Sequence, residues 1–259
     1  MKSSPSLLHA VRIVFAVSLI AFVSGPSSAR AAGGVPQPDV YAALLAKARA
    51  GTLRINRGEP PPSRGFLIFR AGPTPTLPPE VFAGKYRKTA KTSFVSVTVK
   101  SFATLDSLFA PLPTDSKMSK EFPALLTKAD TARVASEKRT VKVPAFIYWA
   151  ASEDDRDFHI ILGSTAQLTS TTVFMNTEAS GLPPAHPTTS PFAQRRKDIR
   201  KILANHENIH GLFKRPVPVS VTGSLFWDGE HRFPNNVGPE GLRPIKAWEI
   251  HPIKLLAER

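Results

Sequence analysis

Apolar and polar positions alternate most clearly between Val217 and Ile253. In the sequence VPVSVTGSLFW several apolar side chains fall on a single parity. These residues are Val219, Val221, Leu225 and Trp227. In the sequence WEIHPI, Trp248 and Ile250 alternate with polar residues. This period of two predicts two half-buried β-strands, joined by a connection rich in Pro, Gly and Asn.

Three more strands and one helix are predicted upstream of this pair. The strands are Arg139 to Ser152, Phe158 to Leu162 and Thr172 to Ala179, all rich in β-branched or aromatic residues. Ser190 then caps a helix whose first residue is Pro191, and Gly211 is expected to end it. The helix carries an apolar stripe made of Phe192, Ile199, Ile202 and Leu203.

Three strands, a helix and two strands follow one another in the order of the OB-fold. The predicted fold is therefore mainly β: a five-stranded OB-like Greek-key barrel over residues 139–259, with one helix between strands 3 and 4. In that fold the loops between strands 1 and 2 and between strands 4 and 5 flank the binding face. Here they are Glu153 to Asp157 and Gly229 to about Lys246. Because this order is complete, residues 139–259 are predicted to fold alone.

Residues 32–138 form a Pro-rich α+β region whose fold the sequence leaves uncertain. It contains a helix candidate, Asp39 to Ala50, and two strand candidates, Gly65 to Arg70 and Ser93 to Lys100. The prolines between these two strands exclude a helix interior or a central strand. A basic run consists of Lys85, Arg87, Lys88 and Lys91.

Residues 1–31 are predicted to be a secretory signal peptide. Lys2 and Arg12 precede an uncharged apolar run, and Ala29 and Ala31 form an A-x-A cleavage site. A retained anchor is the alternative, although the run is short for a membrane span. No later segment approaches that length. We therefore expect an exported protein, periplasmic or extracellular, with no transmembrane segment after signal removal. The chain has no Cys, so disulfides cannot stabilise it.

The formal net charge is +14, and removal of the three signal-peptide cations leaves 14 − 3 = +11. This charge favours an anionic envelope polymer or lipid surface as partner; a merely solvated basic surface is the alternative. Nucleic acid is less expected, because stacking on bases requires exposed aromatic side chains. The three tryptophans, Trp149, Trp227 and Trp248, instead fall on the apolar parity of their strands.

Three segments together resemble a group of uncharacterised exported bacterial proteins that carry an OB-like barrel. They are Asp157-x-His159 with the apolar run after it, TGSLFWDGEH from Thr222 to His231, and WEIHPI from Trp248 to Ile253. The resemblance covers roughly the last 120 residues. It implies export and a barrel, and it carries over neither an activity nor catalytic residues.

The most conspicuous polar residues lie on or beside the two predicted loops. The acidic turn contains Glu153, Asp154, Asp155 and Asp157. Carboxylates this close together can hold a hard divalent cation, although the spacing is not that of a twelve-residue calcium loop. A solvated hairpin turn is the alternative, because Asp is favoured in turns.

The remaining ligand-binding candidates come from the strands and the second loop. They are His159, Asp228, Glu230, His231, Glu249 and His251. Glu249 and His251 must be neighbours, because residues i and i+2 of a strand share a face. His159 joins them if its strand faces the same groove. A structural Glu–His pair and a ligand-binding or proton-transfer role both remain open.

His206-Glu207-Asn208-Ile209-His210 matches the H-E-x-x-H pattern. On a helix, His206 and His210 would share a face and hold zinc, with Glu207 as general base. The sequence as a whole favours an exported OB-like binding or structural module of the cell envelope with no cofactor, and it leaves enzymatic activity open. An anionic envelope component is the expected partner. A zinc-dependent hydrolase using this motif is the alternative.

Overall fold

The computed structural model describes residues 39–56, 82–84, 86–127, 130–153, 155–182 and 189–259. The predicted signal peptide, the strand candidate Gly65 to Arg70 and Asp154 lie outside the described residues. Residues 38–259 form one compact unit.

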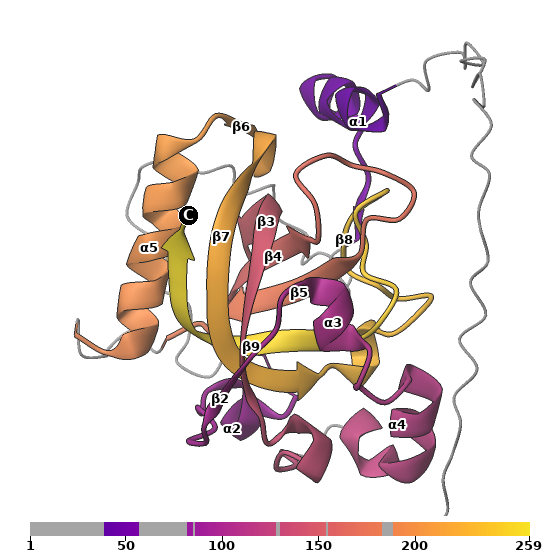
Figure 1. The fold of residues 1–259 in the computed structure, drawn as a ribbon, viewed down its shortest axis with the longest axis vertical. Coiled ribbons are helices and arrows are strands. Elements are labelled where there is room, and N and C mark those ends of the chain that lie inside the picture. Colours follow the sequence, from indigo (N-terminus) through magenta and orange to yellow (C-terminus); the bar gives the residue numbers. More distant parts are fainter. Residues whose placement is uncertain (1–38, 57–81, 85, 128–129, 154, 183–188) are drawn as a thin grey trace, which may run out of the picture. The chain divides into compact units, whose positions relative to one another are not determined.

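The protein is mainly β, and five strands close a hydrogen-bonded ring (Figure 1). They are β3 (Thr140–Ser152), β4 (Phe158–Gly163), β5 (Phe174–Ala179), β7 (Leu212–Trp227) and β9 (Trp248–Glu258). The ring runs β3-β4-β5-β9-β7 and returns to β3. All its pairings are antiparallel except that of β5 with β9, which is parallel. Each predicted strand of the second half is thus confirmed, with small shifts at the ends.

Four short strands extend this framework. The seven-stranded sheet also contains β2 (Val99–Ser101) and β6 (Asn208–Ile209), while β1 (Ile55–Asn56) pairs separately with β8 (Gly238–Pro239). The strand predicted for Ser93 to Lys100 is therefore wrong over most of its length, since only Val99 and Lys100 of it belong to β2. Backbone groups at Val95 instead bond to side chains, the N–H to Ser224 Oγ and the carbonyl to Thr140 Oγ1. These side-chain contacts take the place of hydrogen bonds to the backbone of a neighbouring strand.

Strand alternation separates two sets of buried side chains. The larger hydrophobic cluster contains the inward parity of the ring: Val141, Val143 and Ala145 of β3, Phe158, Ile160 and Leu162 of β4, and Trp248 and Ile250 of β9. Trp149, after the irregularity that shifts the register of β3, instead joins a second cluster with Ile161 and Phe174. All three tryptophans are buried, as predicted.

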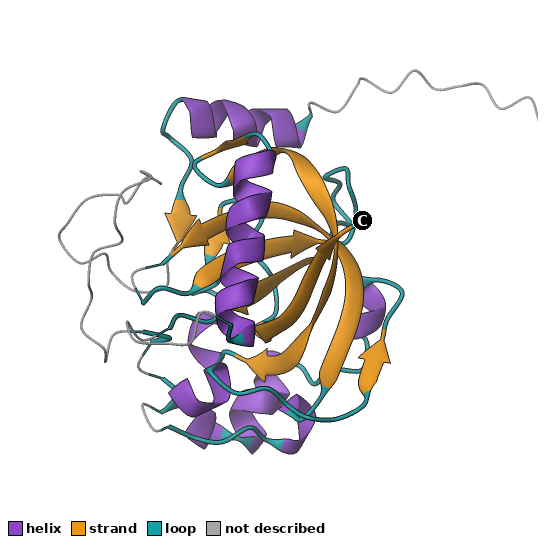
Figure 2. Ribbon diagram, turned by 90° about the vertical axis from the view of Figure 1, so that its left-hand side faces the viewer, coloured by secondary structure: helices purple, strands orange, loops and turns teal. Residues whose placement is uncertain are grey.

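Two helices cover the ring. Helix α5 (Pro191–Asn205) begins at Ser190, whose side chain accepts a hydrogen bond from Ala193 N–H, and it lies against the strands (Figure 2). Its Ile199 and Ile202 join the larger cluster. Helix α1 (Val40–Arg49) is capped by Asp39 as predicted and packs its buried side on the second cluster.

The other described residues of the first half contain several short helices. They are α2 (Lys88–Lys91), α3 (Leu105–Phe109), α4 (Asp115–Glu121) and the 3₁₀ helices η2 (Pro123–Leu126) and η3 (Ala135–Glu137); a further one, η4 (Gly229–His231), follows β7. Leu105, Leu108 and Met118 belong to the same hydrophobic cluster as the ring strands. No helix among the described residues is long and apolar enough to cross a membrane.

Candidate functional site

The outward parity of β4, β5 and β9 carries polar side chains that the strand register aligns in rows. His159 of β4 pairs with Glu178 of β5, and Asn176 of β5 pairs with Glu249 of β9. Continuing the parallel register by two residues brings Glu178 beside His251. Period-two alternation therefore places acids and histidines from three adjacent strands on one face.

This face is covered rather than open to solvent. His159, Glu178, Glu249 and His251 are each at most 2% exposed. Ser180 Oγ donates to the carbonyl of Lys91, which ties the end of β5 to α2. The first half of the chain thus contributes to the cover over these polar groups.

Glu178 lies between the two histidines. Its Oε2 is 2.9 Å from His251 Nδ1, and its Oε1 is 3.3 Å from His159 Nδ1. His251 Nδ1 also lies 3.6 Å from Glu249 Oε2, which confirms that Glu249 and His251 are neighbours. The other nitrogen of the His251 imidazole, Nε2, is 3.0 Å from Ser180 Oγ and 3.7 Å from Asp157 Oδ2.

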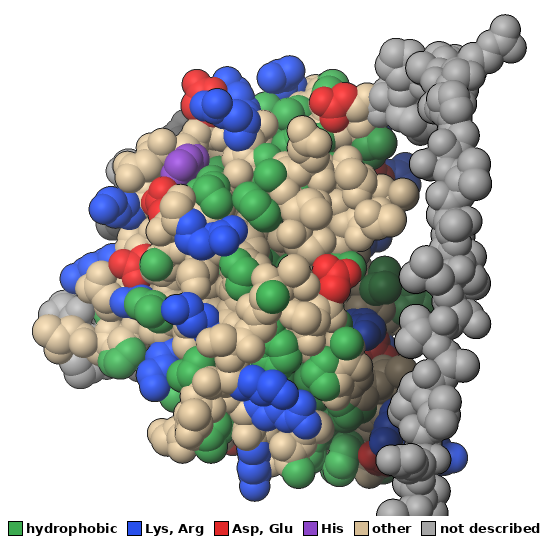
Figure 3. All heavy atoms as spheres, viewed as in Figure 1, with side chains coloured by type: hydrophobic (Ala, Val, Ile, Leu, Met, Phe, Trp, Pro, Cys, Tyr) green, Lys and Arg blue, Asp and Glu red, His purple; other side chains and the backbone are tan. Residues whose placement is uncertain are grey.

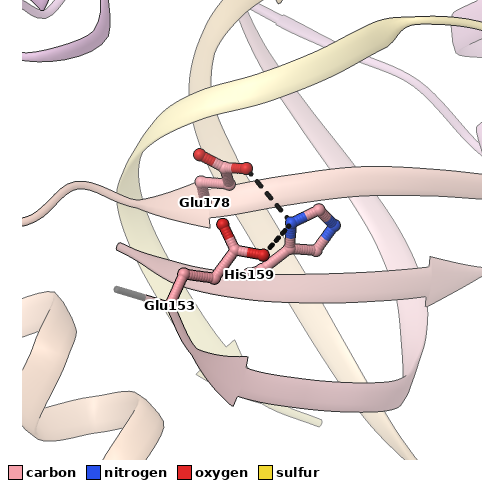
Figure 4. Close-up of side chains that lie close together, drawn as sticks. All are labelled: Glu153, His159 and Glu178. Carbon is pink, nitrogen blue, oxygen red and sulfur yellow. Dashed lines mark ion pairs between the residues drawn. The ribbon is translucent and has the colours of Figure 1, made fainter. Parts of the chain in front are cut away.

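His159 faces two carboxylates with the same ring nitrogen (Figure 4). Its Nδ1 is 3.2 Å from Glu153 Oε1 and 3.3 Å from Glu178 Oε1. Neither ring nitrogen makes a hydrogen bond, although the side chain is fully buried. Glu153 is the partly exposed member of this group, with 23% of its side chain accessible.

Lys91 of α2 reaches the same region from the covering segment. Its Nζ lies 3.4 Å from Asp228 Oδ2, and the same oxygen is 3.4 Å from His231 Nδ1. Burial would raise the pKa of Asp228, but His231 and Lys91 beside it lower the pKa to about 2. Burial would likewise lower the pKa of Lys91, but Asp228 and Glu178 hold it well above its usual value. Lys91 and Asp228 therefore form a buried ion pair.

Phe226 of β7 collects three buried cations around its ring. Arg87 stacks over it at 4.5 Å from guanidinium to ring centroid, with Arg133 at 5.5 Å and Lys91 at 5.6 Å. Such contacts stabilise a cation that has lost part of its hydration. The phenyl ring of Phe226 therefore helps to hold three cations of the first half of the chain next to the buried acids.

Protonation is divided unevenly among the groups next to Glu178. Burial would raise the pKa of Glu178, but His251 and His159 lower it well below its usual range. Burial would lower the pKa of His251, but Glu178 and then its other acidic neighbours raise it to about 9. The pKa of His159 is likewise raised well above its usual value: burial opposes the charge, and Glu153 more than compensates. At neutral pH, Glu178 is thus an ionised carboxylate between two imidazoles whose pKa values are raised.

Two other buried acids are shifted in the opposite direction. Burial and then the charge of Asp155 raise the pKa of Asp157 well above its usual value. Burial and then Glu178 raise the pKa of Glu249. Closely spaced acids that cannot all ionise protonate in part. Raised pKa values at Asp157 and Glu249 thus reduce the negative charge that this buried site carries.

The structure brings most of the predicted ligand-binding residues together. Those in the cluster are Glu153, Asp155, Asp157, His159, Asp228, His231, Glu249 and His251. Glu230 lies at its edge and donates its backbone N–H to Asp228 Oδ1. His159 was expected to join Glu249 and His251 only if its strand faced the same groove. Its side chain does lie on the same face of the sheet as theirs.

The interpretation of the acidic segment as a solvated turn is wrong for Asp157. This residue is 1% exposed, and its Oδ1 accepts a hydrogen bond from Gly181 N–H. A Cβ at position 181 would come within 2.5 Å of the Asp155 carbonyl oxygen, so glycine permits this close approach. The segment that follows β5 therefore encloses the turn.

The zinc interpretation of the HENIH motif fails on backbone geometry. Helix α5 ends at Asn205, not at Gly211, so the motif is not helical. His206 has an extended backbone, and His210 has a φ of 52°, in the left-handed region. Because they are not one helical turn apart, they do not share a helix face as that zinc motif requires.

The motif residues instead have other partners. His206 Nε2 is 2.8 Å from Glu258 Oε2, and Glu207 Oε2 is 2.7 Å from Lys214 Nζ. The His210 carbonyl accepts a hydrogen bond from Trp149 Nε1. Among the described residues, none of the groups that could hold a metal ion contains His206 or His210.

Sequence reasoning missed Glu178, Asn176, Ser180 and Lys91. Glu178 had a usable signal: it is an acid on the parity opposite Met175 and Ala179 in an apolar strand. Lys91 had none, because a lysine in a basic run gives no indication that it will be buried. Its role depends on where α2 packs.

Comparison with known proteins gives no family assignment: no protein-family model, curated protein or solved structure matches this chain. The geometry of the described residues is therefore the basis of the functional argument.

Proposed function

We propose that this protein is an exported OB-like binding module of the cell envelope that contacts anionic envelope components through the exposed face of α5. The observation that carries the proposal is a row of exposed cations on this helix. Lys197, Arg200 and Lys201 lie three and four residues apart and are exposed, and the guanidinium of Arg200 also lies 5.6 Å from the centroid of the Phe158 ring. Arg195, by contrast, pairs with Asp198 at 3.1 Å.

The proposal for the fold has its own support in the strand order. The strands β7-β3-β4-β5 lie side by side in the spatial order 4-1-2-3 of a Greek key, with α5 between the third and fourth strands in sequence. The loops after β3 and β7 both supply acids to one site, as the OB-fold expectation requires. We therefore interpret the ring as an OB-like barrel.

The charge of the exterior supports an anionic partner. Figure 3 shows Lys and Arg side chains spread over one face, with Asp and Glu less prominent. Five of the acids are buried (Glu137, Asp157, Glu178, Asp228 and Glu249), so they do not contribute to the surface. The buried acidic site is unsuited to an anion, so we propose that an anionic partner contacts the exterior.

Co-sedimentation with lipid vesicles tests this function. The protein should bind phosphatidylglycerol vesicles, fail to bind phosphatidylcholine vesicles, and dissociate as salt is raised. Each Lys or Arg near an anionic surface contributes about 1 kcal/mol. Replacing Lys197, Arg200 and Lys201 by Gln should therefore weaken binding by about two orders of magnitude.

The matched control removes three other exposed lysines. Lys117, Lys120 and Lys138 are exposed and lie away from α5 in the sequence. Their replacement by Gln changes net charge by the same amount and should leave most of the binding intact. Equal losses in the two triple variants would show a general charge effect and contradict the proposed α5 face.

Export is tested by N-terminal sequencing of protein recovered from the envelope or medium. The first residue should be Ala32, since the A-x-A site ends at Ala31. An intact Met1 in the membrane fraction would instead support the retained anchor.

A further inference from the structure

We infer that Glu153, His159 and Glu178 form a binding site for one divalent first-row transition-metal ion. The site is independent of the proposed α5 face. It rests on the distances between three donor atoms, on a buried imidazole without hydrogen bonds, and on a route to solvent.

The donor atoms have the spacing of metal ligands. Two donors bound at about 2.1 Å in tetrahedral geometry are ~3.4 Å apart. The distances from His159 Nδ1 are 3.2 Å to Glu153 Oε1 and 3.3 Å to Glu178 Oε1. The three atoms also lie within 4.8 Å of one another. One ion can therefore contact all three donors without a large rearrangement.

Hydrogen bonding alone does not account for the surroundings of His159. The side chain is 0% exposed, and neither Nδ1 nor Nε2 makes a hydrogen bond. One N–H at Nδ1 can make a well-aligned hydrogen bond with only one of the two carboxylates. Buried polar atoms without partners are rare in folded proteins, and many of them contact a bound ion or water. A metal ion facing Nδ1 would take the place of its proton, which is released to solvent, and would contact this nitrogen and both carboxylates.

Neighbouring groups position two of the three ligands. The other oxygen of Glu178 lies 2.9 Å from His251 Nδ1, so the ion pair with this imidazole restrains the carboxylate. The Trp149 ring packs edge-on against the His159 ring, with centroids 5.8 Å apart. Such supporting contacts orient ligands and commonly change metal affinity by ~10–100-fold.

Two other groups of acids and histidines lie nearby. In the group of Asp228, His231 and Glu249, Lys91 Nζ already lies 3.4 Å from Asp228 Oδ2. Solvent access distinguishes the proposed site from the other group. Asp157, Glu178 and His251 also lie close enough to hold an ion, but their side chains are at most 3% exposed. Glu153 is 23% exposed and provides an entry path to the proposed site. A metal site needs such a path in addition to its ligands.

The donor set indicates the class of metal. One imidazole nitrogen and two carboxylate oxygens suit zinc, manganese or iron. Calcium takes six to eight oxygen ligands, more than this group provides. Three protein ligands would leave a further position for water.

Calorimetric titration of the tag-free, chelator-stripped full chain tests the inference. Zn²⁺ and Mn²⁺ should bind with a stoichiometry near one ion per chain, and excess Ca²⁺ should not displace them. Absence of binding would overturn the inference and leave a buried ion-pair network. Displacement by Ca²⁺ would overturn the assigned metal class.

Three variants locate the ion. Glu153→Gln removes a partly exposed ligand, so it should fold normally and bind at least about tenfold more weakly. His159→Gln should abolish binding if it folds, as checked by circular dichroism. The double variant His206→Ala/His210→Ala should bind like wild type. Unchanged affinity in Glu153→Gln, or lost affinity in the double variant, would overturn the assignment.

Discussion

At the scale of single residues, the buried carboxylate of Glu137 joins the two halves of the chain. It forms a bidentate pair with Arg87, with N–O distances of 2.8 and 2.7 Å. The same carboxylate accepts hydrogen bonds from the backbone N–H groups of Trp227 and Val134, both at 2.8 Å. Its removal would leave a buried guanidinium and a strand end without their main partner.

Glu137→Ala should therefore lower the free energy of unfolding by about 3–5 kcal/mol, because an uncompensated buried charge remains. Denaturant unfolding followed by circular dichroism measures this. The control is Glu121→Ala, which removes an exposed pair with Lys117 at 3.6 Å and should cost ~0–1 kcal/mol. Similar losses in the two variants would mean that the Arg87 pair contributes little.

At the scale of elements, the tryptophans at the end of β7 and the start of β9 bond to the start of helix α4. Trp227 and Trp248 are paired across the strands and are both 0% exposed. Trp227 Nε1 donates to Asp115 Oδ1 at 2.9 Å, and Trp248 Nε1 donates to the Pro113 carbonyl at 2.8 Å. Each indole therefore fills the core and holds the start of α4.

Trp248→Ala should cost about 3–5 kcal/mol, and Trp227→Ala nearly the same, because each leaves a cavity and loses a hydrogen bond. Thermal unfolding should show a sharply lower Tm, or soluble expression should fail. Glu230→Gln, at a partly exposed position of η4, should stay within ~0.5 kcal/mol of wild type. Tryptophan variants that melt like wild type would contradict the packing described for these strands.

At the scale of the whole described unit, the domain boundary predicted after Lys138 remains a prediction. The packing shows that the two sides of this boundary share contacts. Leu105, Leu108 and Met118 are fully buried in the same cluster as the ring strands. Arg133 donates to the carbonyl groups of Leu225 and His251. The first half thus supplies both apolar and polar contacts to the second.

A fragment of residues 139–259 should consequently be much less stable than residues 39–259. Losing the short helices exposes apolar side chains of the ring at a cost of roughly 25 cal/mol per Å². Comparing the denaturation midpoints of the two fragments measures the difference. Equal midpoints would show that the ring is stable alone and that the boundary at residue 138 separates two domains.

The sequence alone determined the strands, because alternation identifies which side chains face a core. It correctly predicted β3, β4, β5, β7 and β9, the start of α5, and the burial of the tryptophans. It also identified Glu249 and His251 as neighbours, since the parity opposite a buried face is a local property, and it made His159 a further member only if its strand faced the same groove. These features depend on neighbours within a few residues.

Only the tertiary structure decided what covers that opposite parity. Lys91 is distant in sequence from Asp228, and nothing in a basic run predicts burial against an acid. Arg133 is likewise distant from the His251 carbonyl to which it donates. Likewise, the position of Glu178 between two histidines depends on the register of β5 with β4 and β9. The end of α5 at Asn205 is decided by hairpin contacts of the following residues. Long-range packing therefore turned polar strand faces, which are ordinarily solvated, into a buried site.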